Sequence, residues 1–288
     1  MTTRRERIVT VHIVTDSTSD LPAKLATELG ITVVPLNVHF GEETFRDGEN
    51  LGHDEFYKRL TSTSQLPTTS APPVGTFLTA YQKAAKSADG IVSLHLSSDL
   101  SATVSSARQA SEQMSGTTPV EIIDTRTISL GLGIVVLAAA RAASRGASTA
   151  EVVEEAQRAM AEVEVVCAVD TLEYLEKGGR IGKGAAFVGS LLNVKPILTV
   201  RDGKVHPLEK VRTRTRAISR LVEIVEAAHP VCEIGVMHST TPEEADSLAK
   251  RLAPGVPNGN VLVSQLGVVV GTHSGPGLIG VGFRRERS

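Results

Sequence analysis

The sequence predicts a two-domain α/β protein, with a mostly parallel sheet in the first half and a mixed sheet in the second. The chain has 288 residues, more than the commonest single domain. Up to about residue 162, short β-branched runs alternate with longer amphipathic runs, which is typical of a parallel sheet covered by helices on both faces. The pattern then changes. We expect an N-terminal α/β domain over residues 8–162 and a C-terminal α+β domain over residues 163–288.

Each element of the first half follows from local signals. Gly30 ends a helix, and Pro35 places an edge or an irregularity in the second strand. Ser148 with Glu151 three residues later has the pattern of a capping box. The predicted strands cover residues 8–16, 31–40, 91–96 and 120–125; the predicted helices cover 21–30, 52–63, 73–90, 101–116, 128–143 and 148–163.

The second half is predicted to be α+β. Asp202-Gly203 is a favoured two-residue hairpin turn, so residues 195–211 should form a hairpin. Strands are expected over 164–171, 232–239, 260–273 and 278–283, and helices over 172–179, 184–194, 214–229 and 241–253.

Composition excludes several classes of function. The net charge of −2 argues against a nucleic-acid binder, and an aromatic content of 3% without Trp offers no stacking platform for bases. Two cysteines in different segments, Cys167 and Cys232, indicate neither a disulfide framework nor a metal cluster. No apolar signal-peptide core follows the first residues. We therefore expect a cytoplasmic protein that holds no metal.

The stretch "HLSSDLSATVSSAR" places a crowd of hydroxyl groups at the end of an apolar strand. Such hydroxyls could hold a nucleophile, cradle a phosphate, bind a carboxylate or start a helix. No G-x-S-x-G elbow surrounds these serines, and the glycines and lysine of a phosphate cradle are absent. Capping by Ser97, Ser98 or Asp99 and the binding of a carboxylate remain. His95 is expected to be a structural or wall residue.

Two other hydroxyl-rich segments offer similar alternatives. "TDSTSD" follows the first strand, so Asp16, Ser17 and Thr18 could face a ligand crevice at the carboxyl edge of the sheet. Otherwise Ser19 or Asp20 caps the helix that follows Pro22. In "LPTTSAPPVGTF" the prolines set the backbone path around three hydroxyls. That segment is either part of a site or a rigid loop in which Ser70 caps a helix.

Two glycine-rich segments resemble nucleotide-binding motifs, but neither is predicted to bind a nucleotide. In "LEKGGRIGKG" three residues separate Gly178 from Gly182, whereas a Walker loop needs four. Arg180 in this bend could anchor an anion or another domain. Gly275, Gly277 and Gly280 spell G-x-G-x-x-G, but the motif stands at the end of the chain and runs into a strand.

Two further features of the sequence are candidates for a functional role. His273 lies on the second glycine loop, and a neutral imidazole there can donate a hydrogen bond to a carboxylate. "KVRTRTRAISR" carries five cations and is either a solvated face or a surface that docks an acidic partner. They are Lys210, Arg212, Arg214, Arg216 and Arg220.

Eight segments together resemble the DegV family. They are "TDSTSDLP", "PTTSAP", "LSSDLSATVSSA", "DT" at 124–125, "LEYLEKGGRIG", "GSLLNVKPIL", "GKVHPLEKVRTRTRAI" and "THSGPGLIGVGF". They occur in the family's order and cover nearly the whole chain. The resemblance implies a two-domain DegV-like (EDD) fold with one long-chain fatty acid held between the domains, and no cofactor.

The resemblance also implies residue roles. Thr69, with its neighbour Thr68, and the serines Ser98 and Ser101 would meet the carboxylate; Ser97 is a third choice in the same run. His273 matches the family's histidine near the carboxylate, and Arg180 matches the arginine of its glycine bend. Second-tier contacts to ligand or partner are expected from Arg180, Arg212, Gly275 and Gly277.

In bacteria that make a fatty acid kinase, members of this family are its binding subunit. They present the fatty acid to a separate ATP-binding subunit, which makes acyl phosphate, and Arg212 matches a basic residue of the docking surface. The expected partners are a long-chain fatty acid and such a kinase subunit, with transient contact with a membrane surface and none with nucleic acid. The chain itself would not be an enzyme.

Physical chemistry supports this interpretation. Neutral hydroxyls hold a carboxylate without a strong countercharge, so the carboxylate stays reactive. "AAFVGSLLNVKPIL" offers small and aliphatic side chains for an acyl tunnel, although core packing explains the same residues. The alternative is a serine hydrolase or acyltransferase that uses a serine of 97–101 with His273, and Asp16 or Asp124 as the third member. A nucleotide-binding enzyme is rejected on spacing.

Overall fold

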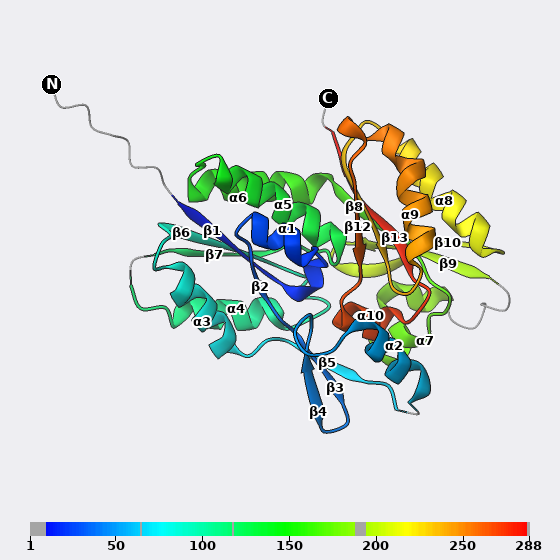
Figure 1. Ribbon diagram of the computed structural model, residues 1–288, viewed down its shortest axis with the longest axis horizontal. Helices are drawn as coiled ribbons and strands as arrows, with labels where there is room; N and C mark the ends of the chain where they lie inside the picture. The colour runs from blue at the N-terminus through cyan, green and yellow to red at the C-terminus, as the bar shows by residue number, and fades with distance from the viewer. Residues whose placement is uncertain (1–9, 64, 117, 188–193, 287–288) are drawn as a thin grey trace.

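A computed structural model describes residues 10–63, 65–116, 118–187 and 194–286, and the described chain forms three β-sheets (Figure 1). The first sheet is parallel throughout and has the order β2-β1-β6-β7. Its strands are β1 (Val11–Asp16), β2 (Thr32–Val34), β6 (Gly90–His95) and β7 (Val120–Asp124). The predicted parallel sheet of the first half is confirmed.

Helices cover both faces of the parallel sheet (Figure 1). On one face lie α1 (Ala23–Glu28), α5 (Leu130–Ser144) and α6 (Thr149–Glu162); on the other lie α3 (Val74–Ala84) and α4 (Thr103–Glu112). Alternation along β1 explains this, because Ile13 packs with α5 and α6 while Val14 packs with α3 and α4. The predicted capping box of Ser148 and Glu151 opens α6.

The second sheet is mixed, as predicted, and has the order β10-β9-β8-β13-β11-β12. Its strands are β8 (Val163–Ala168), β9 (Lys195–Arg201), β10 (Lys204–Val211), β11 (Val231–His238), β12 (Val261–Gln265) and β13 (Ile279–Arg285). Helices α8 (Arg214–Ala227) and α9 (Pro242–Leu252) pack on this sheet, and α5 contacts β8, β11 and β13. Helix α5 therefore joins the two sheets.

The β9–β10 hairpin confirms the predicted turn. Asp202 and Gly203 have φ values of 49° and 80°, the positive values that a two-residue hairpin turn prefers. Short 3₁₀ segments η3 (Ala253–Gly255) and η4 (Pro257–Gly259) connect α9 to β12. The predicted helix over 184–194 is a 3₁₀ segment, η2 (Gly182–Phe187), where the chain is described. Residues 188–193 of that prediction lie outside the described residues.

The third sheet is small and antiparallel, with the order β4-β3-β5, and the sequence did not predict it. It comprises β3 (Asn37–Phe40), β4 (Glu43–Arg46) and β5 (Thr68–Ser70), and the β3–β4 hairpin projects from the molecule in Figure 1. The single strand predicted over 31–40 is wrong. Pro35 has no N–H for a ladder, so the chain leaves the parallel sheet at Val34 and enters the third sheet at Asn37.

A second correction concerns residues 260–273, which were predicted to be one strand. Strand β12 ends at Gln265, and Val268–Ser274 form helix α10. A run of three valines favours a strand, but Val268 and Val269 pack in a cluster with Phe56 and Tyr57 of α2 (His53–Ser62). Burial against α2 therefore overrides the local β preference.

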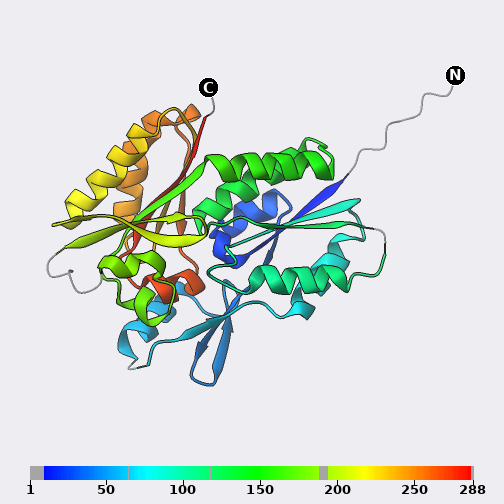
Figure 2. The ribbon, with the colours of Figure 1, turned by 180° about the vertical axis from the view of Figure 1, so that it is seen from behind.

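Helix α10 lies against the short helix α7 (Glu173–Lys177), and Figure 2 shows the two side by side from behind. A 3₁₀ turn, η1 (Ser17–Ser19), follows β1. Within the described residues, the helices are too short or too polar to cross a membrane.

Candidate functional site

A cavity of about 320 Å³ lies between the parallel sheet and the mixed sheet. Its walls combine the loop after β6, the residues just before α5, strands β8 and β9, and one side of α10. Most of the lining side chains are aliphatic; examples are Leu96, Leu100, Ile128, Val165, Leu198 and Val270. A long apolar ligand fits the chemistry of this wall better than a polar one.

Four of the predicted site residues line this cavity. They are Thr69 on β5, Ser101 before α4, Arg180 after α7 and His273 near the end of α10. Oγ1 of Thr69 lies 2.8 Å from Nε2 of His273. Segments far apart in the sequence thus bring hydroxyl groups, an imidazole and a guanidinium to one apolar cavity.

His273 is neutral at pH 7. Burial, assisted by the positive charge of Arg180, lowers the pKa of His273 from 6.5 to about 4. Its Nδ1 is buried and has no hydrogen-bond partner among the described residues. A proton on Nδ1 would be a buried donor without an acceptor, so we assign the proton to Nε2. His273 then donates to Thr69, and the hydroxyl proton of Thr69 is left for a ligand oxygen.

Ser101 is held by local contacts. Its N–H donates to the carbonyl oxygen of Ser97 at 3.2 Å, and its Oγ lies 2.8 Å from Oγ1 of Thr103. The N–H of Thr103 also donates to Ser101 Oγ at 3.3 Å. Ser101 is half-buried on the cavity wall, whereas Thr103 is fully buried.

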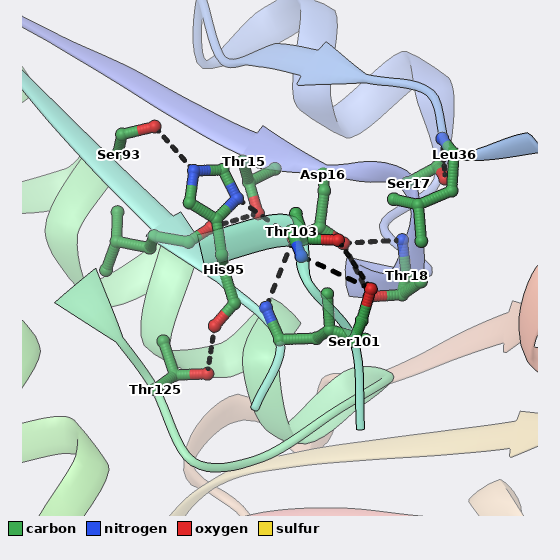
Figure 3. A network of polar contacts seen from close by, with 12 residues as sticks. Thr15, Asp16, Ser17, Thr18, Leu36, Ser93, His95, Ser101, Thr103 and Thr125 are labelled. Atoms are coloured by element: carbon green, nitrogen blue, oxygen red, sulfur yellow. Dashed lines mark hydrogen bonds and ion pairs between the residues drawn. The ribbon is translucent and has the colours of Figure 1, made fainter. Parts of the chain in front are cut away.

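A buried polar network supports the loop that carries Ser101 (Figure 3). Asp16 Oδ2 lies 2.9 Å from His95 Nδ1 and accepts from the N–H of Leu96 at 3.1 Å. Nε2 of His95 lies 2.7 Å from Ser93 Oγ. Thr125 donates to the carbonyl oxygen of His95 at 2.8 Å. Asp16 and His95 are 0% exposed, so both serve the backbone after β6 and do not face the cavity.

This arrangement corrects two expectations about "TDSTSD". Thr18 lines the cavity, whereas Asp16 and Ser17 do not. Asp16 instead caps the 3₁₀ turn by accepting from Thr18 N–H at 3.1 Å. Helix α1 begins after Pro22 without a side-chain cap, so the predicted cap by Ser19 or Asp20 is wrong.

Ser97 and Ser98 lie away from the cavity wall. Ser97 is buried and donates to the carbonyl oxygen of Gly203 at 2.8 Å, which ties this loop to the β9–β10 turn. Ser98 is exposed and donates to Asp124 Oδ2 at 2.5 Å. The predicted cap of α4 by Ser97, Ser98 or Asp99 is also wrong, because its N-cap is Ala102. Ser101 is the hydroxyl of this run that reaches the cavity.

A second cavity, of about 220 Å³, adjoins the first. Thr68 lines it, and Thr69, Arg180 and His273 line both cavities. Lys177 and Tyr174 add polar groups to its wall. Arg180 is anchored through donations to the carbonyl oxygens of Leu100 at 3.2 Å and Gly178 at 2.8 Å. The polar end of the first cavity therefore borders the second, more polar cavity.

Gly275 and Gly277 shape the loop after α10. Their φ values are 71° and 79°, which favour glycine. A Cβ on Gly275 would lie 2.2 Å from the Tyr174 ring, and one on Gly277 would lie 2.1 Å from Asp170 Oδ2. Neither glycine lines either cavity, so both act through the backbone turn and close packing.

The predicted basic cluster is largely paired. Arg214 binds Glu244, Arg216 binds Glu223, and Arg220 binds Glu209. Arg212 is exposed between β10 and α8 and does not line the two cavities. Among the residues that the structure describes, no group of three or more His, Cys, Asp or Glu side chains could hold a metal ion.

The part of the wall that α10 supplies was not predicted from the sequence. Val269, Val270 and Ser274 line the cavity, but the valine run was interpreted as a strand. Gly267 before it and Gly275 after it bracket the helix and were the available signal.

Comparison with known proteins agrees with this architecture. A protein of Streptomyces coelicolor described as DegV domain-containing is 42% identical over 94% of this chain and 97% of its own length. A structure from Thermus thermophilus, described as fatty acid binding of a DegV family protein, superposes with a TM-score of 0.89 at 36% identity, covering 96% of this chain and 99% of the other.

DegV from Bacillus subtilis, described as a fatty acid binding protein, superposes with a TM-score of 0.87 at 35% identity and covers 96% of this chain and 100% of its own. A family model described as "Uncharacterised protein, DegV family" matches residues 10–286. The chain belongs to the DegV family.

Proposed function

We propose that this protein binds a long-chain fatty acid, with the acyl chain in the 320 Å³ cavity and the carboxylate at Thr69, Ser101 and His273. The observation that carries the proposal is the junction of an aliphatic cavity with a largely neutral polar end. The relatives from Thermus thermophilus and Bacillus subtilis that are described as binding fatty acids support it.

The polar end suits a carboxylate that must stay reactive. Thr69, polarised by the Nε2–H of His273, and Ser101 offer hydroxyl donors to the carboxylate oxygens. Arg180 lies nearby, but its Nε and Nη1 are occupied by the carbonyl oxygens of Leu100 and Gly178. We therefore propose that hydrogen bonds from the hydroxyl groups, more than an ion pair with Arg180, hold the carboxylate.

Burial of the acyl chain supplies the affinity. At roughly 0.8 kcal/mol per methylene, a sixteen-carbon acid gains on the order of 11 kcal/mol before the costs of ordering are subtracted. A wall of aliphatic side chains such as Leu96, Val165 and Leu198 can provide this burial. No cofactor is required for such binding.

We propose further that the bound acid is presented to a separate ATP-dependent kinase subunit. A carboxylate oxygen would attack the γ-phosphorus of the partner's ATP, and acyl phosphate and ADP would form. The second cavity supports an approach from that side, because it shares Thr69, Arg180 and His273 with the first. Exposed Arg212 is the proposed contact with this partner.

We propose that residues 8–162 and 163–288 form two domains with the ligand between them. We also propose that the protein acts in the cytoplasm and makes transient contact with a membrane surface. The division is supported by the sheets, since the four parallel strands precede residue 162 and the six mixed strands follow it. Wall residues from both sets, such as Leu96 and Val165, support the position of the ligand.

The alternative, a serine hydrolase or acyltransferase, finds less support. Ser101 Oγ contacts Thr103, and Nε2 of His273 contacts Thr69. The two carboxylates considered as the third member of a catalytic triad form other hydrogen bonds, Asp16 with His95 and Asp124 with Ser98. Incubation with an activated acyl ester decides between the two, since turnover or a covalent acyl-serine would overturn the carrier proposal.

Native mass spectrometry of the purified protein, followed by lipid extraction, tests the main proposal. We expect one fatty acid for each chain. Recovery of no fatty acid, together with no binding of added palmitate or oleate, would overturn it.

A further inference from the structure

Helix α10 begins against two buried carboxyl groups from different parts of the chain. Oδ1 of Asp20 accepts from the N–H of Gly267 at 2.8 Å, and Oδ1 of Asp47 accepts from the N–H of Val268 at 2.9 Å. Asp20 follows β1, and Asp47 follows β4. Their side chains therefore join the start of α10 to the parallel sheet and to the third sheet.

The two carboxyl groups lie close together. The position that a Cβ on Gly267 would occupy is 2.8 Å from both carboxyl oxygens of Asp47 and 3.2 Å from Oδ1 of Asp20. Both side chains are nearly inaccessible, with exposed fractions of 4% for Asp47 and 5% for Asp20. Two like charges at this separation, away from water, are strongly unfavourable.

Burial of the pair favours a retained proton, and it outweighs the hydrogen bonds to the two carboxyl groups, which lower both pKa values. Oδ2 of Asp47 has no hydrogen-bond partner among the described residues, so full ionisation would leave a buried charged oxygen unpaired. Oδ2 of Asp20 accepts from Ser129 at 2.5 Å. Burial raises the pKa of Asp47 from 3.8 to about 6, and burial also raises the pKa of Asp20 well above its usual range.

We propose that Asp20 and Asp47 are positioning residues that clamp the start of α10 while the pair retains a proton, so that loss of the proton loosens the helix that carries His273. Val269, Val270 and His273 of α10 line the cavity. The clamp itself does not depend on the proposed function. Its consequence for cargo rests on the proposed function: as the clamp loosens, a bound fatty acid is released faster.

The direction of the pH dependence follows from linkage. When α10 opens, water reaches Asp47 and its pKa returns from about 6 toward 3.8. The closed state therefore binds more protons between these values, and opening becomes more favourable as the pH rises through this window. For one proton, the opening equilibrium grows about tenfold between pH 5 and pH 7. The raised pKa of Asp20 acts in the same direction.

The other groups around the pair do not reverse this direction. Asp16 raises the pKa of both carboxyl groups, and Asp47 raises the pKa of Asp20. Tyr57 of α2 is kept protonated, since burial raises its pKa well above the usual value. His53 at the start of α2 lies near the backbone of Leu266, and burial lowers its pKa.

Hydrogen exchange of the backbone amides tests the clamp without any lipid. For the wild-type chain we expect the protection factors of Val268 and Val269, corrected for the intrinsic pH dependence of exchange, to fall about tenfold from pH 5 to pH 7. Asp47→Asn keeps an oxygen for the N–H of Val268 but cannot ionise, so its protection should change less than twofold. Glu154→Gln, an exposed carboxylate change on α6, should behave as the wild type.

Carbon NMR of the Asp47 carboxyl group in the wild-type chain is the second measurement, and it does not depend on the folding of any variant. A titration midpoint near pH 6 supports the proposal. A midpoint near pH 4, or equal protection of α10 at pH 5 and pH 7 in the wild type, would overturn it. If the clamp titrates as expected but no fatty acid binds, the proposed function fails and the clamp stands.

Discussion

Thr69 and His273 are 204 positions apart in the sequence, yet Oγ1 of the first lies 2.8 Å from Nε2 of the second. The contact joins β5 of the third sheet to α10 and lies where the two cavities meet. With the proton assigned to Nε2, it directs the hydroxyl proton of Thr69 toward a ligand.

Replacement of Thr69 by Val should weaken the binding of palmitate by about tenfold to a hundredfold, the range of a hydrogen bond to a charged group. Binding of the matching alcohol should weaken much less, because it lacks the charge. Isothermal titration with both ligands measures the difference. Thr68→Val is the matched control, since Thr68 is exposed and does not line the apolar cavity. Equal losses for acid and alcohol would mean that Thr69 serves the fold.

Replacement of Ser101 by Ala should weaken palmitate binding by about tenfold, whereas Ser98→Ala should leave it unchanged. The reason is placement: Ser101 lines the cavity, and the hydroxyl of Ser98 is engaged by Asp124. Titration of the two variants side by side measures this. A larger loss in Ser98→Ala than in Ser101→Ala would show that the loop adopts another arrangement when the acid binds.

Replacement of His273 by Gln should make the free energy of unfolding less sensitive to acid. The folded protein keeps His273 neutral down to a pKa of about 4, whereas the unfolded chain protonates it near 6.5. The wild type therefore loses stability as the pH falls from 6.5 toward 4 through this residue. Urea unfolding at several pH values measures the slope.

The difference between wild type and variant isolates His273, because Asp47, with its raised pKa, changes stability in the opposite direction over the same range. Identical slopes in the two proteins would contradict a buried neutral imidazole.

The two cysteines should react at very different rates. Cys167 lines the cavity, and burial raises its pKa to about 12, so little thiolate exists at pH 8. Cys232 is exposed. Titration with a disulfide reagent that releases a coloured product should detect the thiol of Cys232 quickly and the thiol of Cys167 only after denaturation. Cys232→Ser should abolish the fast phase, and a fast phase that survives would place Cys167 in contact with solvent.

Much of the fold could be predicted because its signals are local. The parallel sheet, the Ser148 capping box and the Asp202-Gly203 turn each follow from a few neighbouring residues. The third sheet could not be predicted, because β5 pairs with β3 across 30 or so residues and carries little hydrophobic pattern of its own. Helix α10 was missed because its valines favour a strand until they are packed against α2.

The α/β class, the three hydroxyl-rich segments and the likeness to one family follow from residue types and their order along the chain. Which hydroxyls meet depends on the tertiary structure. Ser97 turns to Gly203 and Ser98 to Asp124, while Ser101 reaches the cavity. The direction of each side chain there depends on the backbone after β6, which Asp16 and a turn from the other sheet hold in place.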